Sequence, residues 1–235
     1  MEEITSKLKV SGMTVRRELQ ALADQGKVIR THGGATMAQR ISFEFAFLSR
    51  ARDNEAAKDA IGRAAAGLIA EGQSVLLDSG TTTLAVARHL RGRKGVQIIT
   101  TSLPIASLLQ YEHEMHVLLL GGALRAGSPD LAGALTEANL ESIRADAAFI
   151  GTDGVDSDGT AYNQSPEVAR LLAKMTCAAR RVYVIADNSK LGRTALWRSC
   201  RLRDLTGLIT DEAAPRPLLA SLSKAGAKVI RASGK

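Results

Sequence analysis

The sequence predicts an α/β protein, in which a parallel sheet with helices on both faces follows a partial winged helix-turn-helix. Two observations predict the sheet. From Ser74 onward, short runs rich in β-branched residues and leucine alternate with longer stretches of helical period. Most of these runs lead into a turn built from polar residues and glycine. A third observation predicts the first part, because two short helical segments meet at Ser11-Gly12 and a short strand follows them.

Seven short apolar runs supply the expected strands. They are Ser74–Leu77, Val96–Thr100, His116–Leu120, Ala147–Ile150, Val182–Ala186, Gly207–Ile209 and Lys228–Ile230. The intervening segments of helical period, several opened by a proline that suits a first helical turn, are Thr82–Leu90, Pro104–Gln110, Glu137–Arg144, Pro166–Ala179 and Pro215–Ala225. A further helix is expected ahead of the first strand, since apolar residues recur at helical spacing from Ala57 to Leu68.

Composition limits the class of protein. At 235 residues and 45% hydrophobic, the chain is long enough for one sizeable core and a small appended module. Its net charge of +7 favours a polyanionic partner. Cys177 and Cys200 do not form a metal-ligand cluster, so we expect reduced thiols, no metal site and no cofactor. Apolar runs such as Val117–Leu120 are far too short to span a membrane and no leader opens the chain, which predicts a soluble, cytoplasmic protein.

The N-terminal segment has the pattern of a helix-turn-helix. Residues Glu3–Val10 form the first expected helix and Thr14–Ala23 the second, with Val15, Leu19 and Leu22 on the buried stripe of the second. This spacing predicts that the second helix packs on the first and presents its other face to solvent.

Polar and basic residues of this segment suit contact with DNA. Ser11 is placed to cap the second helix, and Arg16 and Arg17 project from its first turns, where a recognition helix meets base edges and phosphates. Residues 27–30 are typical of a short strand and 31–35 of a tight basic turn, as in a wing. An Arg-Arg pair taken alone is more typical of a solvated surface helix.

The longer string from Val10 to Leu19, followed by Gly26 and by Arg30–Ala35, resembles the DNA-binding signature of the DeoR family of bacterial regulators. The resemblance implies contacts with double-stranded DNA from six residues: Ser11, Thr14, Arg16, Arg17, Arg30 and His32. In that family a further helix precedes the segment that begins here at Met1, so the resemblance implies a truncated, partial helix-turn-helix.

The loop Asp78–Thr83 follows the first expected strand and opens a helix. Backbone N–H groups and the helix dipole favour an anion at such a position, and hydroxyl side chains add donors. Capping of the helix by one hydroxyl is the simpler interpretation, but three successive threonines after a glycine exceed that need. The chain lacks the P-loop and dinucleotide fingerprints, which argues against ATP and NAD. We therefore expect phosphate binding here.

Polar clusters also follow four of the other expected strands, at Thr101-Ser102, Gly121–Arg125, Gly151–Gly154 and Asp187–Lys190. Open α/β sheets bind ligands outside the carboxyl ends of their strands. Each cluster alone is typical of an ordinary turn. Their shared location predicts one composite pocket.

Most of Glu55–Lys190 is again similar to the DeoR family. The motifs are Asp78–Thr83, Leu120-Gly121-Gly122, Ala148–Gly151 with Asp153-Gly154, Glu167, and Ala186-Asp187 with Ser189-Lys190. The resemblance implies a sheet related to ribose-5-phosphate isomerase that binds a phosphorylated sugar or related metabolite. The expected ligand-binding residues are Asp78, Ser79, Gly80, Thr81, Thr82, Thr83, Thr101, Ser102, Gly121, Gly122, Arg125, Asp153, Glu167 and Lys190. Thr101 stands where the family often has Asn, and Ala57 replaces the usual acidic neighbour of Lys58.

These observations predict a DNA-binding regulator of the repressor type, a homo-oligomer whose operator affinity depends on a phosphorylated metabolite. The expected domains are residues 1–36 for DNA binding, a linker 37–54 and an effector-sensing domain 55–235. The alternative from another class is an isomerase-like enzyme that uses Asp153, Glu167 or Lys190 for proton transfer. An isomerase has no use for a DNA-binding signature, which favours the regulator, with no catalytic residue. A third interpretation is a ligand-binding protein that has lost DNA binding.

Overall fold

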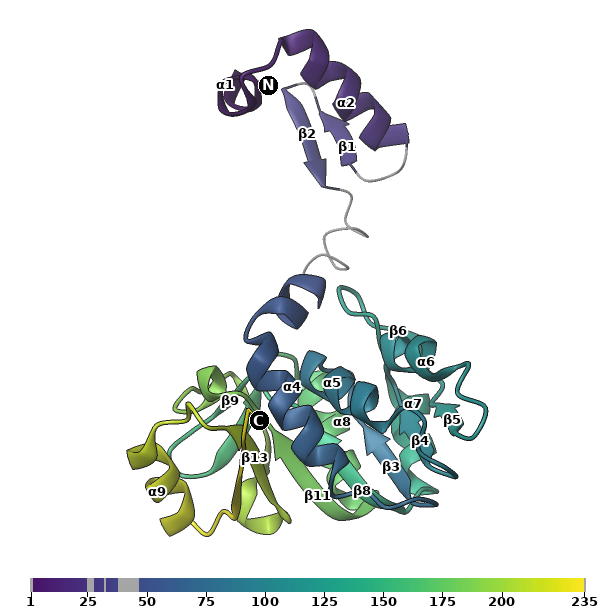
Figure 1. The fold of residues 1–235 in the computed structure, drawn as a ribbon, viewed down its shortest axis with the longest axis vertical. Helices are drawn as coiled ribbons and strands as arrows, with labels where there is room; N and C mark the ends of the chain where they lie inside the picture. The colour runs from purple at the N-terminus through teal and green to yellow at the C-terminus, as the bar shows by residue number, and fades with distance from the viewer. Residues whose placement is uncertain (1, 25–27, 32, 38–46, 235) are drawn as a thin grey trace. The chain divides into compact units, whose positions relative to one another are not determined.

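The computed structural model describes residues 2–24, 28–31, 33–37 and 47–234 (Figure 1). The chain divides into two compact units, Met1–Ser49 and Arg50–Lys235. The predicted fold class, a parallel sheet with helices on both faces preceded by a helix-turn-helix, is confirmed.

The N-terminal unit consists of a helix-turn-helix and a β-hairpin. Helices α1 (Glu2–Leu8) and α2 (Gly12–Asp24) precede strands β1 (Val28–Thr31) and β2 (Gly34–Met37), which pair antiparallel. Val15 is buried in α2, whereas Leu19 and Leu22, expected on the buried stripe, are only half-buried. The buried stripe of α2 is therefore shallower than predicted.

The larger unit is built on a seven-stranded sheet of order β14-β13-β11-β8-β3-β4-β5, parallel throughout. Its strands are β3 (Ser74–Leu77), β4 (Gln97–Thr100), β5 (His116–Leu119), β8 (Ala145–Ile150), β11 (Ala179–Ile185), β13 (Gly207–Asp211) and β14 (Val229–Ala232). All seven predicted strands are present. Because the strands are parallel, their carboxyl ends and the loops that follow lie along one edge.

Helices cover both faces of this sheet. They are α4 (Glu55–Ala66), α5 (Thr81–Leu90), α6 (Leu103–Leu109), α7 (Ala134–Glu141), α8 (Pro166–Cys177) and α9 (Arg216–Lys224). In Figure 1, α4 and α5 lie in front of the sheet and α8 behind it. The apolar core on the α8 side includes Leu172 and Met175 from that helix, Leu222 from α9, and Val184 from β11.

Helices α4 and α5 pack with their backbones in direct contact. A Cβ at Gly62 in α4 would lie 2.7 Å from the carbonyl carbon of Ala85 in α5. Only glycine permits this approach, so the two helices are expected to move as one body.

Three features of the chain were not predicted. A small antiparallel sheet of order β12-β10-β9 and a hairpin β6-β7 lie outside the main sheet; their strands are β9 (Gly154–Val155), β10 (Thr160–Asn163), β12 (Trp197–Arg201), β6 (Ala123–Leu124) and β7 (Leu131–Ala132). Several have only two residues, too few to show a period of two. Within the expected linker 37–54, residues 47–52 are helical; residues 38–46 lie outside the described part of the chain.

Candidate effector-binding site

The loop after β3 is organised by a buried carboxylate. Asp78 Oδ1 accepts the backbone N–H of Ser79 at 2.6 Å, and Oδ2 accepts that of Gly151 at 3.0 Å. The second bond joins the loop after β3 to the loop after β8. Burial raises the pKa of Asp78, and the nearby charge of Asp130 acts in the same direction. Asp78 therefore organises the backbone of this edge.

Helix α5 begins at this loop, and no side chain caps the backbone N–H groups of its first turn. Gly80 is the cap residue and has no side chain to accept from them. Thr81 and Thr82 are half-buried at the helix start, whereas Thr83 is fully buried. The Thr83 hydroxyl donates within the loop, 2.6 Å from the carbonyl oxygen of Asp78. Of the three threonines, only Thr81 and Thr82 are therefore accessible to solvent.

A series of side-chain hydrogen bonds connects the loop after β3 to the β6-β7 hairpin. The Ser79 hydroxyl donates to Asp130 Oδ2 at 2.6 Å. Arg125 donates to both oxygens of Asp130, at 3.2 Å from Nε and 2.9 Å from Nη2. Arg125 was expected to bind the ligand, and here its guanidinium is engaged by Asp130. Sequence reasoning missed Asp130; the turn Gly127-Ser128-Pro129 between the two residues was the available signal of a hairpin.

The residues after β4 are buried at the same edge. The Ser102 hydroxyl caps α6 by accepting the N–H of Ile105 at 3.3 Å. Thr101 is fully buried, and its hydroxyl has no hydrogen-bond partner among the described residues. A buried hydroxyl without a partner is costly. Thr101 is therefore a buried polar group without a described partner, at the position where the expected pattern has asparagine.

Gly121 and Gly122 have a packing role. A Cβ at Gly122 would lie 2.0 Å from the Thr136 hydroxyl and 2.8 Å from the carbonyl oxygen of Ala132. The Gly121 carbonyl accepts the Thr136 hydroxyl at 2.8 Å. These contacts join the loop after β5 to α7.

The two expected sugar-facing carboxylates have different surroundings. Asp153 is half-buried, and its Oδ2 accepts the N–H of Gln164 at 2.9 Å. Glu167 is exposed in the first turn of α8. Between them in sequence, Asn163 is 4% exposed, and its Oδ1 has no partner in the described structure. Asn163 was not predicted, since nothing in the local pattern distinguishes it from a surface asparagine.

Lys190 is held on a turn fixed by two buried aspartates. The short helix η1 (Asn188–Lys190) follows β11, and Asp187 Oδ1 accepts the N–H and hydroxyl of Ser189 at 3.0 and 2.5 Å. Asp211, at the end of β13, accepts the backbone and side-chain N–H groups of Asn188 at 2.6 and 2.8 Å. Lys190 is half-buried on this rigid turn.

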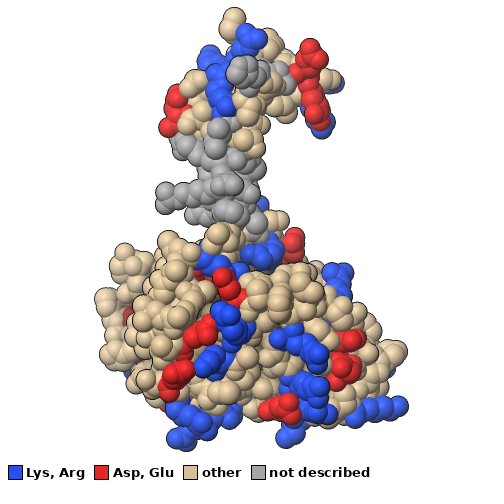
Figure 2. All heavy atoms as spheres, turned by 180° about the vertical axis from the view of Figure 1, so that it is seen from behind, with Lys and Arg blue, Asp and Glu red and all other residues tan. Residues whose placement is uncertain are grey.

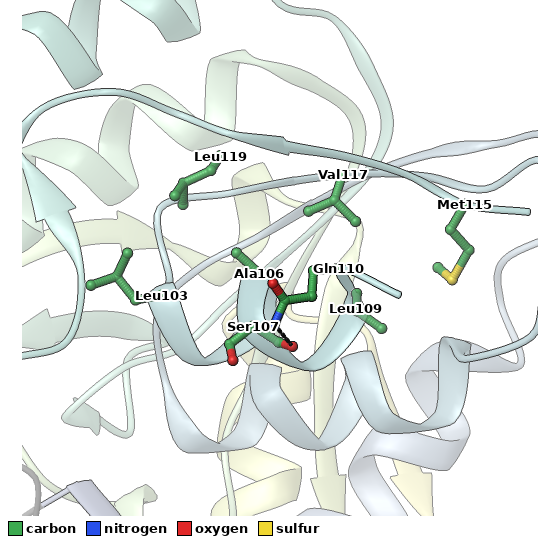
Figure 3. A pocket seen from close by; sticks show the side chains of 8 residues that line it. All are labelled: Leu103, Ala106, Ser107, Leu109, Gln110, Met115, Val117 and Leu119. Atoms are coloured by element: carbon green, nitrogen blue, oxygen red, sulfur yellow. Dashed lines mark hydrogen bonds between the residues drawn. The ribbon is translucent and has the colours of Figure 1, made fainter. Parts of the chain in front are cut away.

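An apolar groove of about 560 Å³ lies between α6 and β5 (Figure 3). Its walls include Leu103, Leu109, Val117 and Leu119, and the polar Gln110 donates back to the carbonyl of Ser107 at 3.0 Å. Such a lining does not suit a phosphorylated polyol. The groove therefore differs in chemistry from the polar residues at the carboxyl ends of the strands.

The charged side chains on the α7–α8 side of the larger unit are of mixed sign (Figure 2). Ion pairs connect the two helices, with Arg170 Nε 3.0 Å from Glu137 Oε1 and Lys174 Nζ 2.8 Å from Glu141 Oε1. This face lacks the single-sign patch typical of a DNA-binding surface.

The candidate DNA-contacting residues lie in the N-terminal unit. Ser11 Oγ accepts the N–H of Thr14 at 3.1 Å, which is the predicted cap, and Arg16 and Arg17 are exposed on α2. Arg30 on β1 donates to Gln20 of α2 at 2.7 Å, so the hairpin is tied to the helix. His32 lies outside the described residues.

Among the described residues, no group of three or more His, Cys, Asp or Glu side chains could hold a metal ion. Within the same residues, none of the helices is both long and apolar enough to cross a bilayer.

Two family models match this chain. Residues 1–40 match the DeoR-like helix-turn-helix domain, and residues 53–212 match the DeoR C terminal sensor domain.

Two sequence relatives and two solved structures are similar to this chain, the relatives over most of its length and the structures over part of it. The HTH-type transcriptional repressor GlcR of Bacillus subtilis is 34% identical over 97% of this chain and 88% of its own length. The glycerol-3-phosphate regulon repressor of Escherichia coli is 30% identical over 92% and 85%. Ribose 5-phosphate isomerase A of Methanocaldococcus jannaschii has a TM-score of 0.44 and 22% identity, covering 59% of this chain and 55% of that one. eIF2B delta of Chaetomium thermophilum has a TM-score of 0.48 and 19% identity, over 72% and 59%.

Proposed function

This chain belongs to the DeoR family of transcriptional regulators, and from that premise we propose that its sensor unit binds a phosphorylated sugar or related metabolite that changes operator affinity. The chain is a regulator rather than an enzyme, since relatives over nearly its whole length are named repressors and its N-terminus matches a DNA-binding domain.

The observation that carries the proposal is the start of α5. An uncapped helix N-terminus offers backbone N–H groups and the positive end of a helix dipole, which together favour an anion. Thr81 and Thr82 add hydroxyl donors, and Lys190 supplies a cation on the turn after β11. These three elements suit a phosphate group.

The remaining polar groups suit the rest of a sugar-like ligand. Thr101 and Asn163 are buried polar side chains with unused capacity, and Asp153 is half-buried. Hydroxyl, amide and carboxylate groups can distinguish arrangements of sugar hydroxyls. One relative is named for a glycerol-3-phosphate regulon, which supports a small phosphorylated polyol as the first compound to test.

Calorimetric titration tests this proposal. Glycerol 3-phosphate and hexose phosphates are compared with glycerol and the free hexoses. Binding of a phosphorylated compound, with its unphosphorylated counterpart binding at least about tenfold more weakly, is expected from loss of a charge-assisted contact of roughly 1.5–3 kcal/mol.

Variants locate the site. Thr81→Leu with Thr82→Leu places apolar bulk at the helix start and should abolish binding of the phosphorylated compound. Ser223→Leu, at an exposed position of α9, is the matched control and should bind as the natural chain does. Equal affinity for phosphate and dephosphorylated forms would refute the proposal.

For DNA binding, we propose that Ser11, Thr14, Arg16 and Arg17 contact the operator from α2 and that Arg30 and His32 contact it from the hairpin. Supporting this, α2 exposes both arginines and the Arg30–Gln20 bond fixes Arg30 beside that helix.

We also propose a homo-oligomer in which β5 meets β5 of a second copy. β5 is the last strand of the sheet, so along its outer side no described strand pairs with it. Leu118 is 53% exposed although it lies inside the strand, on the face opposite to Val117 and Leu119, which line the apolar groove. Two such edges related by a two-fold axis pair their free backbone groups, and the same symmetry suits a palindromic operator.

A further inference from the structure

We propose that buried Lys58 and the turn at Asn54 transmit effector binding to the segment that leads to the DNA-binding unit. The inference rests on the proposed function and concerns how the effector site regulates it.

Lys58 holds the residues that precede α4. Its side chain is buried, and its ammonium donates to the backbone carbonyls of Arg50 and Asp53. Residues 47–52 are helical, and the last carbonyls of a helix have no partner within it. A cation at such an end satisfies them and complements the helix dipole. Lys58 thus fastens residues 50–53 to the sensor unit.

Asn54 fastens the same segment to the effector edge. It adopts the left-handed conformation, with φ of 52°, and its Nδ2 donates to Asp187 Oδ1 at 3.0 Å. That oxygen also accepts both groups of Ser189, on the turn that carries Lys190. One buried carboxylate therefore joins residue 54 to the turn that supplies the cation for phosphate.

Lys58, Asp187 and Lys190 also interact through their charges. Burial lowers the pKa of Lys58; among the neighbouring charges, Asp187 opposes this effect most strongly and Lys190 adds to it. An anion beside Lys190 offsets the repulsion between the two lysines. Ligand binding thus acts directly on the groups that hold the segment.

A second connection runs through α5. A small cavity of about 130 Å³ is lined by Lys58 and Glu55 on one side and by Thr81 and Arg88 of α5 on the other. Thr81 opens the helix proposed to hold the phosphate, and Gly62 packs α4 against α5 without intervening side chains. A shift of α5 on binding the ligand therefore moves α4 and Lys58 with it.

Together these contacts place residues 50–54 between the two parts of the effector site. Phosphate held by α5 and Lys190 draws the turn after β11 and the start of α5 toward each other. Asp187 and Lys58 move with these two segments, which alters their hydrogen bonds to residues 50–54. Lys58 is a positioning residue in this scheme and does not touch the ligand.

Two variants separate this role from simple folding. Asn54→Gly keeps the left-handed backbone and removes the bond to Asp187. Lys58→Met keeps the aliphatic stem and removes the ammonium. Lys174→Met, which removes a half-buried lysine on α8 that pairs with Glu141 and lies outside the proposed relay, is the matched control.

The probe is inorganic phosphate, in buffer of constant ionic strength, with hydrogen–deuterium exchange followed in peptides covering residues 47–54 and 79–84. In the natural chain and in Lys174→Met, phosphate should slow exchange at 79–84 and change it at 47–54. In Asn54→Gly and Lys58→Met, the effect at 79–84 should persist and that at 47–54 should disappear.

The same proteins are titrated with an operator duplex selected by the natural chain from a random-sequence library. Phosphate should change operator affinity by about fivefold or more in the natural chain and by less than about twofold in both variants. Absence of any effect at 79–84 would refute the phosphate site itself. An effect at 79–84 without one at 47–54 in the natural chain, or an unchanged effect at 47–54 in both variants, would overturn the relay.

Discussion

At the scale of single residues, the two arginines of α2 that are proposed to contact DNA are exposed on the N-terminal unit. Arg16 is exposed, and Arg17 lies 3.6 Å from Glu18 in a pair whose two side chains are mainly exposed to solvent. An exposed pair of this kind contributes little to stability. Both guanidinium groups are therefore available to phosphates at small cost.

Replacement of Arg16 and Arg17 by alanine should abolish specific operator binding while leaving the fold intact. Each lost phosphate contact reduces the slope of log affinity against log salt by about 0.9, so the slope should fall by roughly 2. Fluorescence anisotropy at several salt concentrations measures it. Alanine at the exposed Arg203 and Arg216 is the control; an unchanged slope in the α2 variant would remove these residues from the interface.

Asp146 shows a residue-level effect on stability. Its Oδ2 accepts the backbone N–H and the hydroxyl of Ser74, each at 2.9 Å. These bonds lower the pKa of Asp146 from its ordinary value of 3.8. A carboxyl whose pKa is lower in the folded state stabilises that state above the unfolded pKa, and this contribution is lost as the pH falls through the folded-state pKa.

Asp146→Asn should therefore reduce the free energy of unfolding by about 1 kcal/mol at neutral pH, because the bonds lose their charge assistance. The difference from the natural chain should shrink below about pH 4. Urea denaturation at a series of pH values measures it, with exposed Asp204→Asn as control. A difference that stayed constant with pH would contradict the ionic character of the contact.

At the scale of elements, β5 and β14 are the two edge strands of the sheet, and of the two β5 is the one that carries an exposed large apolar side chain, Leu118. The flanks of β5 differ, because one side pairs with β4 and the other pairs with no described strand. Exposed apolar edge strands normally join another strand or are protected by charge. No described strand pairs with the outer side of β5, and Leu118 carries no charge that would oppose pairing. We therefore propose self-association at this strand.

Leu118→Arg should weaken self-association by roughly tenfold or more, since charge at the pairing edge opposes a second copy carrying the same charge. Analytical ultracentrifugation over a range of concentrations measures the dissociation constant. Leu196→Arg changes a leucine that is 77% exposed and lies off this edge, and should leave assembly unchanged. If the two variants assembled equally well, β5 would not be the interface.

At the scale of the molecule, regulation requires a coupling free energy between metabolite binding and operator binding. A metabolite alters operator affinity only if it binds one state of the protein better than another, and the operator must then alter metabolite affinity by the same factor. The coupling expected for such a regulator is about 1–3 kcal/mol.

Calorimetric titration of the natural chain with the effector, with and without saturating operator, should give a ratio of about 5 to 150 between the two dissociation constants. Operator titrations with and without effector should give the same ratio. A scrambled duplex of equal length is the control. Effector affinity indifferent to operator at saturation would show that sensing and DNA binding are not linked.

The sequence by itself determined the parallel sheet, because most of its strands are short apolar runs that lead into a polar turn and alternate with segments of helical period. It also determined the Ser11 cap and the loop at Asp78–Thr83, since both depend on residues close together in the chain. Spacing along the chain reports such local interactions directly.

Only the tertiary structure decided which polar groups are engaged. Arg125 is held by Asp130, Thr83 bonds within its own loop, and Thr101 remains without a described partner. The tie between Asn54 and Asp187 joins residues 133 positions apart. Folding creates the distance between Asn54 and Asp187, and no local pattern encodes it. The bonds of Arg125 and Thr83 join residues only five positions apart, but spacing along the chain does not say which of several polar neighbours a side chain engages, because that depends on how the surrounding segments bury it.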